Sequence, residues 1–146
     1  MPPRFSPRDL VTPPEAVWND EVEGAWAEPR SSEEAEQLLV AYYLSQVSRN
    51  VVAVLREVGW TRGDLADAIG EDARNLRRKL NGEYPAMFED VLRWALALDR
   101  PDIVYVPNST DDLAPRGAVE DVRRYLVSGP TTTPGRDCTR REEGSL

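Results

Sequence analysis

The sequence predicts a mostly α-helical protein, a small helical bundle with a long N-terminal helix and a short C-terminal extension. Three observations predict this fold. Apolar residues recur every three or four positions from residue 31 to 58, capping residues precede further periodic stretches between 60 and 100, and a β-branched run is confined to 103–106. With 146 residues, 40% of them hydrophobic, the chain is long enough for one modest core.

The chain divides into four parts by composition. Residues 1–30 form an acidic, proline-rich extension that we expect to be mostly irregular, and residues 31–100 form the helical domain. Residues 101–127 are expected to hold a short strand and a helix, a candidate dimerisation element, and residues 128–146 a disordered tail. Trp18 and Trp26 either pack onto the folded domain, which we favour, or belong to a linear docking motif.

Residues 31–58 predict the long helix. Ser31 and Glu34 have the spacing of a capping box, and neither Pro nor Gly follows before Gly59. An unbroken helix here is about 40 Å long, more than a small domain needs. We therefore expect either a break near Ser48–Asn50 or a first half that packs on a second copy. The apolar stripe consists of Leu39, Tyr43, Val47, Val51, Val54 and Val58.

Residues 60–82 predict two short helices joined by a tight turn. Thr61 and Asp64 resemble a capping box, and Gly70 can adopt the left-handed backbone that ends the first helix. The second helix runs from about Asp72 to Leu80 and ends at Asn81-Gly82. At about 100° per residue, its arginines 74, 77 and 78 lie opposite an apolar seam of residues 73, 76 and 80.

A third amphipathic helix is expected next, with Pro85 in its first turn and an end at residues 99–101. Its predicted buried face consists of Phe88, Val91, Leu92, Ala95 and Leu98. Trp60 and Trp94 are expected in the core or at its edge. Further along, residues 103–106 predict a short strand or an extended segment, and residues 117–127 a last helix whose apolar face holds Val119, Val122 and Leu126.

Positive charge is concentrated in one short stretch of an acidic chain. The net charge is −8, and residues 1–48 alone hold 3 basic and 9 acidic residues. Residues 49–100 hold 9 of each, and four of those basic residues fall between 74 and 79. A domain of zero net charge has to rely on such a local patch if it binds DNA, because phosphate neutralisation supplies much of the affinity.

The composition argues against an enzyme. The chain has no histidine, which removes the commonest general base and the commonest zinc ligand, and its one cysteine, Cys138, lies in the polar tail. No metal-ligand spacing and no phosphate-binding glycine loop is present, so we expect no metal and no cofactor. No run approaches the roughly 18 apolar residues of a membrane span, and we expect a soluble, cytoplasmic protein with no membrane partner.

Residues 49–99 resemble the helix-turn-helix of the Cro/repressor (Xre-like) class, the lambda-repressor-like fold. The resemblance rests on Thr61, the Leu65-Ala66 pair, Gly70, Leu76 and the Asn81-Gly82 pair, with twelve residues from Gly70 to Gly82. A small residue at 66 suits two helices that cross closely, and the second helix must bury one face while the other enters the major groove.

The resemblance implies which residues contact DNA. Ala73, Arg74 and Arg77 take the base-facing positions of the recognition helix. Asn75 and Arg78 reach bases or flanking phosphates, and Arg62 lies where this class often places a side chain that clamps the backbone. The partner is then double-stranded DNA, and the chain is expected to act as a homodimer, with two recognition helices about 34 Å apart.

Other interpretations remain open. Glu71 stands where relatives usually have an apolar residue, and the arginine ridge could be a solvated face in which Arg74 and Arg78 pair with Glu71. The same fold could instead be a protein-interaction module, antitoxin-like or an assembly factor, that binds a basic partner through its acidic extension. The extension could also fold over the arginines and inhibit DNA binding.

Overall fold

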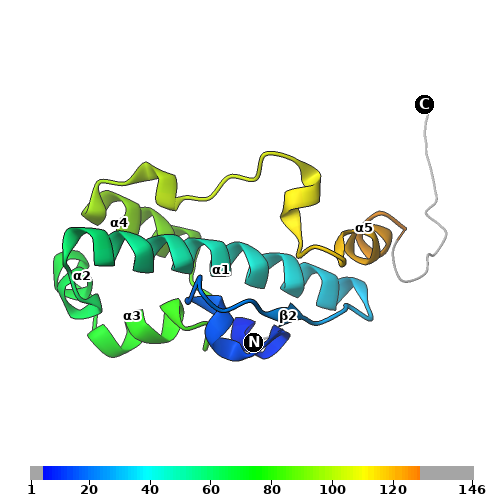
Figure 1. Cartoon of the computed structure of the whole chain (residues 1–146), viewed down its shortest axis with the longest axis horizontal. Helices are drawn as coiled ribbons and strands as arrows, with labels where there is room; N and C mark the ends of the chain where they lie inside the picture. Colours follow the sequence, from blue (N-terminus) through cyan, green and yellow to red (C-terminus); the bar gives the residue numbers. More distant parts are fainter. Residues whose placement is uncertain (1–4, 129–146) are drawn as a thin grey trace.

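The computed structural model describes residues 5–128, and the fold is mostly α-helical, as the sequence predicts. Its five α-helices are arranged along the first and longest one (Figure 1). They are α1 (Ser32–Val58), α2 (Arg62–Ile69), α3 (Ala73–Leu80), α4 (Phe88–Leu98) and α5 (Val119–Ser128). Short 3-10 turns are η1 (Pro7–Leu10), η2 (Pro14–Val17), η3 (Pro101–Ile103) and η4 (Thr110–Leu113). Two-residue strands β1 (Val11–Thr12) and β2 (Ala25–Trp26) pair antiparallel.

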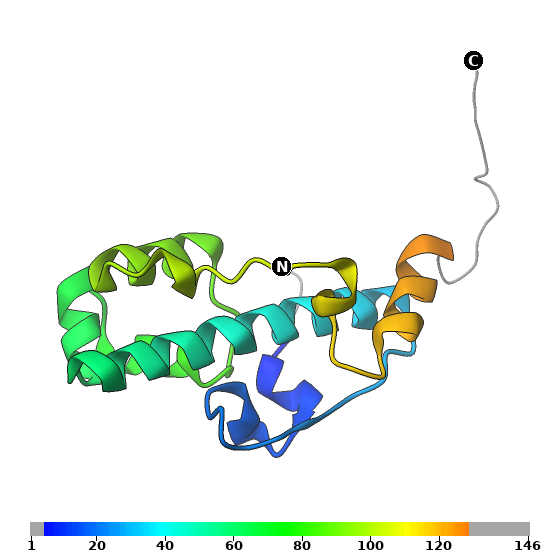
Figure 2. The ribbon, with the colours of Figure 1, turned by 45° about the horizontal axis from the view of Figure 1, so that its top comes forward.

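Helix α1 is the axis of the molecule and is continuous. The Ser31 hydroxyl accepts a hydrogen bond from the Glu34 amide at its start, and Gly59 ends it in a left-handed conformation. The expected break near residues 48–50 is absent from α1. The first half is instead covered by the chain's own residues, because α5 packs on it from one side and the N-terminal segment (residues 5–30) from another (Figure 2).

Within residues 5–128, α1 is also the one helix long and apolar enough, by length and composition, to cross a membrane. That finding differs from the sequence analysis, which expected no such segment. Half of its most apolar window is buried inside the protein. Small and aliphatic side chains such as Ala35, Val47 and Val51 make these internal contacts, so α1 serves here as the core helix of the bundle.

The other short helices gather round the C-terminal half of α1 (Figure 1). Helices α2, α3 and α4 enclose the main core with α1, and η3 closes it with the fully buried Ile103. The buried side chains contributed by the short helices are Leu65, Ala66, Leu76, Leu80, Val91, Trp94, Ala95 and Leu98. Burial of this set fixes how α3 is turned, and therefore which of its residues face solvent.

Helix α4 is rotated and shortened relative to the prediction. It begins at Phe88, where the Asp90 carboxylate accepts a hydrogen bond from the Met87 amide, so Pro85 precedes the helix. Phe88 and Leu92 were predicted to be buried, but they are 62% and 40% exposed. The fully buried Trp94 determines which side of α4 faces the core. Burial of its large side chain stabilises the fold more than burial of Phe88 or Leu92 would.

Trp60 was expected in the core or at its edge, and at 38% exposed it is not one of the buried core residues. The region after α4 also departs in part from the prediction. Residues 103–106 form no strand: η3 ends at Ile103, Val104 is extended, and residues 104–109 have no regular secondary structure before η4 begins. The last helix is present as α5, with Val122 buried against α1 and Leu126 42% exposed. Residues 129–146, in which the disordered tail was expected, lie outside the described residues.

The N-terminal segment packs onto the bundle. Arg49 of α1 donates hydrogen bonds to the carbonyl oxygens of Ala16 (3.0 and 2.7 Å) and Val22 (3.1 Å). The rings of Trp26 and Tyr42 pack edge to face, with their centres 5.4 Å apart. Trp18 lies against the apolar cluster formed by Val11, Ala16 and Val17. The prediction that one or both tryptophans pack on the folded domain is therefore confirmed for Trp26, whereas Trp18 packs on the N-terminal segment itself.

Candidate nucleic-acid interface

Helices α2 and α3 are joined by a turn of three residues. Thr61 and Asp64 form the predicted capping box at the start of α2, with hydrogen bonds of 3.1 and 2.8 Å. Gly70 ends α2 with φ +71°, and the Asp72 carboxylate accepts a hydrogen bond from the Arg74 amide (2.7 Å) at the start of α3. These local interactions define where α2 begins and ends and where α3 begins.

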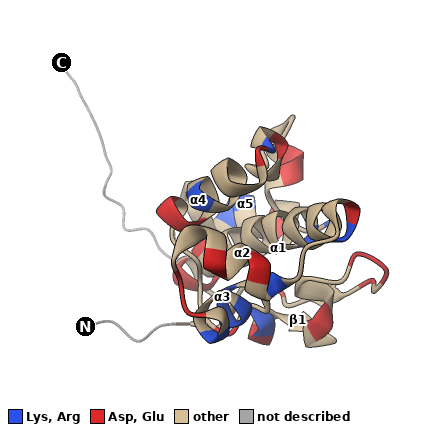
Figure 3. Ribbon diagram, turned by 90° about the vertical axis from the view of Figure 1, so that its left-hand side faces the viewer, with Lys and Arg blue, Asp and Glu red and all other residues tan. Residues whose placement is uncertain are grey.

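The buried side of α3 determines its exposed side. Leu76 and Leu80 are fully buried in the main core. The predicted contact residues on α3 are all exposed: Ala73, Arg74, Asn75, Arg77 and Arg78. The placing of Ala73 in the apolar seam is therefore wrong, because only Leu76 and Leu80 of α3 are buried. Figure 3 shows the basic residues of α3 gathered on one side of the molecule, next to the acidic residues of α2. The fold therefore contains the predicted ridge of arginines opposite a seam of two buried leucines.

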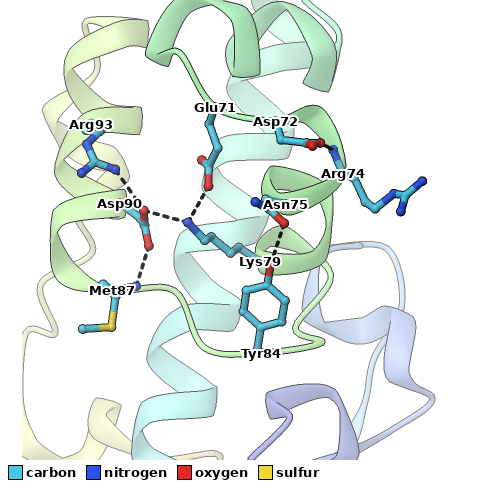
Figure 4. Close-up of polar contacts among 9 residues, drawn as sticks. All are labelled: Glu71, Asp72, Arg74, Asn75, Lys79, Tyr84, Met87, Asp90 and Arg93. Atoms are coloured by element: carbon cyan, nitrogen blue, oxygen red, sulfur yellow. Dashed lines mark hydrogen bonds and ion pairs between the residues drawn. The ribbon is translucent and has the colours of Figure 1, made fainter. Parts of the chain in front are cut away.

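Arg74 and Arg77 make no ion pair with any residue between 5 and 128. The Arg74 side chain points away from the ribbon (Figure 4). The alternative in which Arg74 and Arg78 pair with Glu71 is wrong, because Glu71 faces Lys79 instead. Two guanidinium groups are thus exposed without an internal partner, and each presents several N–H donors in a planar fork suited to guanine or phosphate.

Arg62 is held at the junction of α2 and α3. Its guanidinium donates a hydrogen bond to the Asn81 side-chain oxygen at 2.9 Å. Burial, and after it the positive charge of Arg77, lowers the pKa of Arg62 below its ordinary value. Arg62 remains charged at neutral pH because an arginine pKa starts so high. Arg62 and Arg77 are therefore two like charges close enough to influence one another, an arrangement that an anion would stabilise.

Two further residues orient the predicted contacts. The Tyr84 hydroxyl donates a hydrogen bond to the Asn75 side-chain oxygen at 3.2 Å (Figure 4). At the end of α3, the Asn81 side-chain oxygen accepts the hydrogen bond from the Arg62 guanidinium and so orients Arg62. The sequence pattern indicated Asn81 as the end of the helix and as part of the resemblance, but not as a partner of Arg62, and it did not indicate Tyr84. Its spacing of nine residues from Asn75 across a turn has no helical periodicity that could have indicated the contact.

Arg78 is only partly available. Its guanidinium lies 3.7 Å from the Glu83 carboxylate, and Arg8 of the N-terminal segment lies 3.8 Å from the same group. The side chains of Arg78 and Glu83 are 46% and 41% exposed. Long, exposed pairs of this kind contribute about 0–1 kcal/mol, so a phosphate can displace the carboxylate.

The fourth basic residue of the stretch, Lys79, does not face solvent. Its ammonium lies 2.6 Å from Glu71 and 3.0 Å from Asp90, and these three side chains are only 16%, 15% and 6% exposed (Figure 4). Burial lowers the pKa of Lys79, but hydrogen bonds to the two carboxylates outweigh it, so the pKa is raised. Glu71 is therefore accommodated in place of an apolar residue by a partly buried ion cluster, and Lys79 belongs to the scaffold.

A separate cleft of about 770 Å³ has no residue of α3 in its lining. Residues 20–28, α1 and the loop 115–118 line it, and Trp26 and Tyr42 are part of its wall. Four carboxylates of this lining pair with no cation among the described residues: Asp20, Glu21, Glu23 and Glu28. This cleft is the acidic surface that a basic partner would meet.

The structure thus brings the six predicted contact residues to one side of the molecule, with Arg62 partly buried and Arg78 partly paired. It adds Arg8, Asn81, Glu83 and Tyr84, which come from other segments or from the turn after α3. No protein-family model, no curated protein and no solved structure matches this chain.

Proposed function

We propose that this chain is a sequence-specific DNA-binding regulator of transcription, of the Cro/repressor (Xre-like) helix-turn-helix type, acting on double-stranded DNA in the cytoplasm. Helix α3 is its recognition helix. The observation that carries this proposal is the pair of exposed arginines, Arg74 and Arg77, opposite the buried Leu76 and Leu80. A helix so placed can enter the major groove, where arginine pairs with guanine through two hydrogen bonds.

The surrounding charges support a local rather than a general interaction. Residues 49–100 hold equal numbers of basic and acidic residues, and Asp64 and Asp67 make α2 acidic. Such a surface repels phosphate outside the contact made by α3. Specificity then rests on a few base contacts, each worth about 1–3 kcal/mol, and on a second subunit that doubles them. The homodimer remains part of the proposal.

Selection from random duplex DNA followed by binding measurements tests the proposal. We expect Arg74→Ala and Arg77→Ala each to weaken binding to the selected sequence about 10- to 100-fold, in line with the loss of one two-pronged base contact. Arg30→Ala is the matched control, because Arg30 lies at the far end of α1 and is 86% exposed. Binding that is unchanged by both α3 substitutions would reject the function.

The acidic cleft favours a second candidate, a protein-interaction module that binds a basic polypeptide. Neutralising its carboxylates together (D20N/E21Q/E23Q/E28Q) removes the charge without removing the N-terminal segment. A partner that is purified with the wild type and with Arg74→Ala, but not with this variant, would favour the second candidate over DNA binding. If the partner is still purified with both variants, it contacts another surface, and the acidic cleft is rejected as its binding site.

A further inference from the structure

The N-terminal segment is bound to the end of the proposed recognition helix. The Arg8 amide donates a hydrogen bond to the Gly82 carbonyl at 3.0 Å, and the Ser6 hydroxyl donates one to the Glu83 carbonyl at 2.7 Å. Gly82 has φ +77°, and a Cβ there would lie 3.1 Å from Val17 and 3.2 Å from the Arg8 nitrogen. Residues some 75 positions apart in the sequence therefore meet at one turn through a close backbone approach.

This contact places the side chain of Arg8 next to the exposed side of α3. Its guanidinium lies 5.9 Å from the Trp18 ring centre, a cation–π distance that orients the group. It also lies 3.8 Å from the Glu83 carboxylate, which Arg78 approaches to 3.7 Å. The Arg8 side chain remains 32% exposed. Two arginines from separate segments thus lie on either side of one carboxylate.

We propose that Arg8 and Arg78 form a phosphate-binding point for the DNA backbone beside α3, and that Glu83 occupies it when DNA is absent. The inference rests on the proposed function and deepens it, because it adds a contact from the N-terminal segment. A carboxylate and a phosphate oxygen both accept hydrogen bonds from guanidinium N–H groups. Glu83 therefore competes with the phosphate and lowers the affinity.

The energetics favour displacement of the carboxylate. Glu83 reaches both arginines only at 3.7–3.8 Å, in exposed pairs that contribute about 0–1 kcal/mol. A DNA phosphate that takes its place also releases condensed counterions, which adds a favourable and salt-dependent free energy. The N-terminal segment then strengthens DNA binding, the opposite of an inhibitory flap over the arginines.

Substitution of Arg8 tests the inference with a labelled, mixed-sequence duplex of about two helical turns as the probe. We expect Arg8→Gln to weaken binding roughly five- to tenfold near 0.1 M salt and to reduce the salt slope of log K by about 0.9, the value for one phosphate contact. Arg8→Lys should retain most of the affinity and the slope. Arg30→Gln, which removes the same charge at the far end of α1, should leave both unchanged. Thermal unfolding of each variant checks that the fold is intact.

Substitution of Glu83 should have the opposite effect on DNA affinity. Glu83→Gln should tighten binding about two- to fivefold, as expected from removal of a weak competing pair. Glu33→Gln, an exposed carboxylate in the first turn of α1, is the matched control and should have no effect. If Arg74→Ala and Arg77→Ala weaken binding while Arg8→Gln behaves like Arg30→Gln, only this inference is overturned. If Arg74→Ala, Arg77→Ala and Arg8→Gln all bind like the wild type, the proposed function fails as well.

Discussion

At the residue scale, Lys79 stabilises Glu71, a carboxylate at a position where an apolar residue was expected. It is the only lysine of the chain, and it neutralises Glu71 and Asp90 in a region that is mostly excluded from solvent. One Glu71 oxygen, Oε1, is buried without a hydrogen-bond partner among the described residues. The cluster therefore depends on the ammonium group more than on the exposed Arg93, which approaches Asp90 at 3.3 Å.

Removal of the ammonium should be costly for folding. We expect Lys79→Met to lower the free energy of unfolding by about 2–3 kcal/mol, somewhat less than for a fully buried pair, because Glu71 loses its cation and Asp90 keeps only the exposed Arg93. Arg93→Met is the control at the same carboxylate and should cost about 0.5 kcal/mol or less, since Arg93 is 56% exposed. Urea denaturation measures both, and equal losses would contradict this assignment.

The same lysine gives a pH dependence. Its pKa is raised above the ordinary value of 10.5 in the folded state, so the folded protein binds this proton more tightly than the unfolded chain. The contribution is therefore present in full below 10.5 and is lost as the pH rises through the folded value. The difference in unfolding free energy between wild type and Lys79→Met should stay constant from about pH 7 to 10 and shrink above that range. Shrinkage already between pH 7 and 9 would show that another group is responsible.

At the scale of elements, two glycines with similar backbone angles have different surroundings. Gly70 and Gly82 have φ +71° and +77°, but a Cβ at Gly70 meets nothing within 4 Å, whereas at Gly82 it meets Val17 and Arg8. Gly70 therefore serves the turn between α2 and α3 alone. Gly82 serves both the end of α3 and the contact with the N-terminal segment.

Alanine substitutions should separate these roles. We expect Gly70→Ala to cost about 1–2 kcal/mol of stability, the usual penalty for a left-handed residue with a Cβ. Gly82→Ala should cost about 1 kcal/mol more, because the added carbon also overpacks the contact with the segment. Gly63→Ala, inside α2 and without a positive φ, should instead stabilise the protein by about 0.5–1 kcal/mol. Thermal unfolding of the three variants measures the order of their stabilities, which should be Gly63→Ala, then Gly70→Ala, then Gly82→Ala.

Helix limits were more predictable than helix faces. Ser31, Thr61 and Gly70 act through hydrogen bonds and backbone angles of their own neighbourhood, so the sequence predicts them well. The buried side of α4 depends on whether Trp94 or Phe88 finds room in a core made by other helices. The contact of Arg8 with the end of α3 involves a backbone carbonyl, which carries no sequence signal. The composite part of the candidate site therefore could not be predicted, whereas the arginines of α3 could.

At the scale of the whole molecule, Arg49 couples the N-terminal segment to the bundle. It donates to two carbonyl oxygens of the segment, and the buried Ser45 hydroxyl donates to a third, that of Val17, at 3.0 Å. A hydrogen bond from a charged group contributes about 1.5–3 kcal/mol. The position of Arg8 beside α3 therefore depends on a residue in the middle of α1.

Loss of this link should release the segment while the helices remain folded. We expect Arg49→Ala to make residues 13–28 the first site of chymotryptic cleavage, at Trp18 or Trp26, and to weaken DNA binding about as much as Arg8→Gln. Arg56→Ala, an exposed arginine of the same helix, is the control and should be as resistant as the wild type. Cleavage that begins instead in α2 or α3 would indicate that the bundle itself is damaged.

The anchoring of Ser6 to Glu83 has a practical consequence for how the protein can be handled. The first described residues lie next to Glu83, which is 3.7 Å from Arg78, whereas α5 packs on the first half of α1, away from α3 (Figure 1). A purification tag or fluorescent reporter at the front of the chain would crowd the surface assigned here to the duplex. The same tag at the back would leave that surface open.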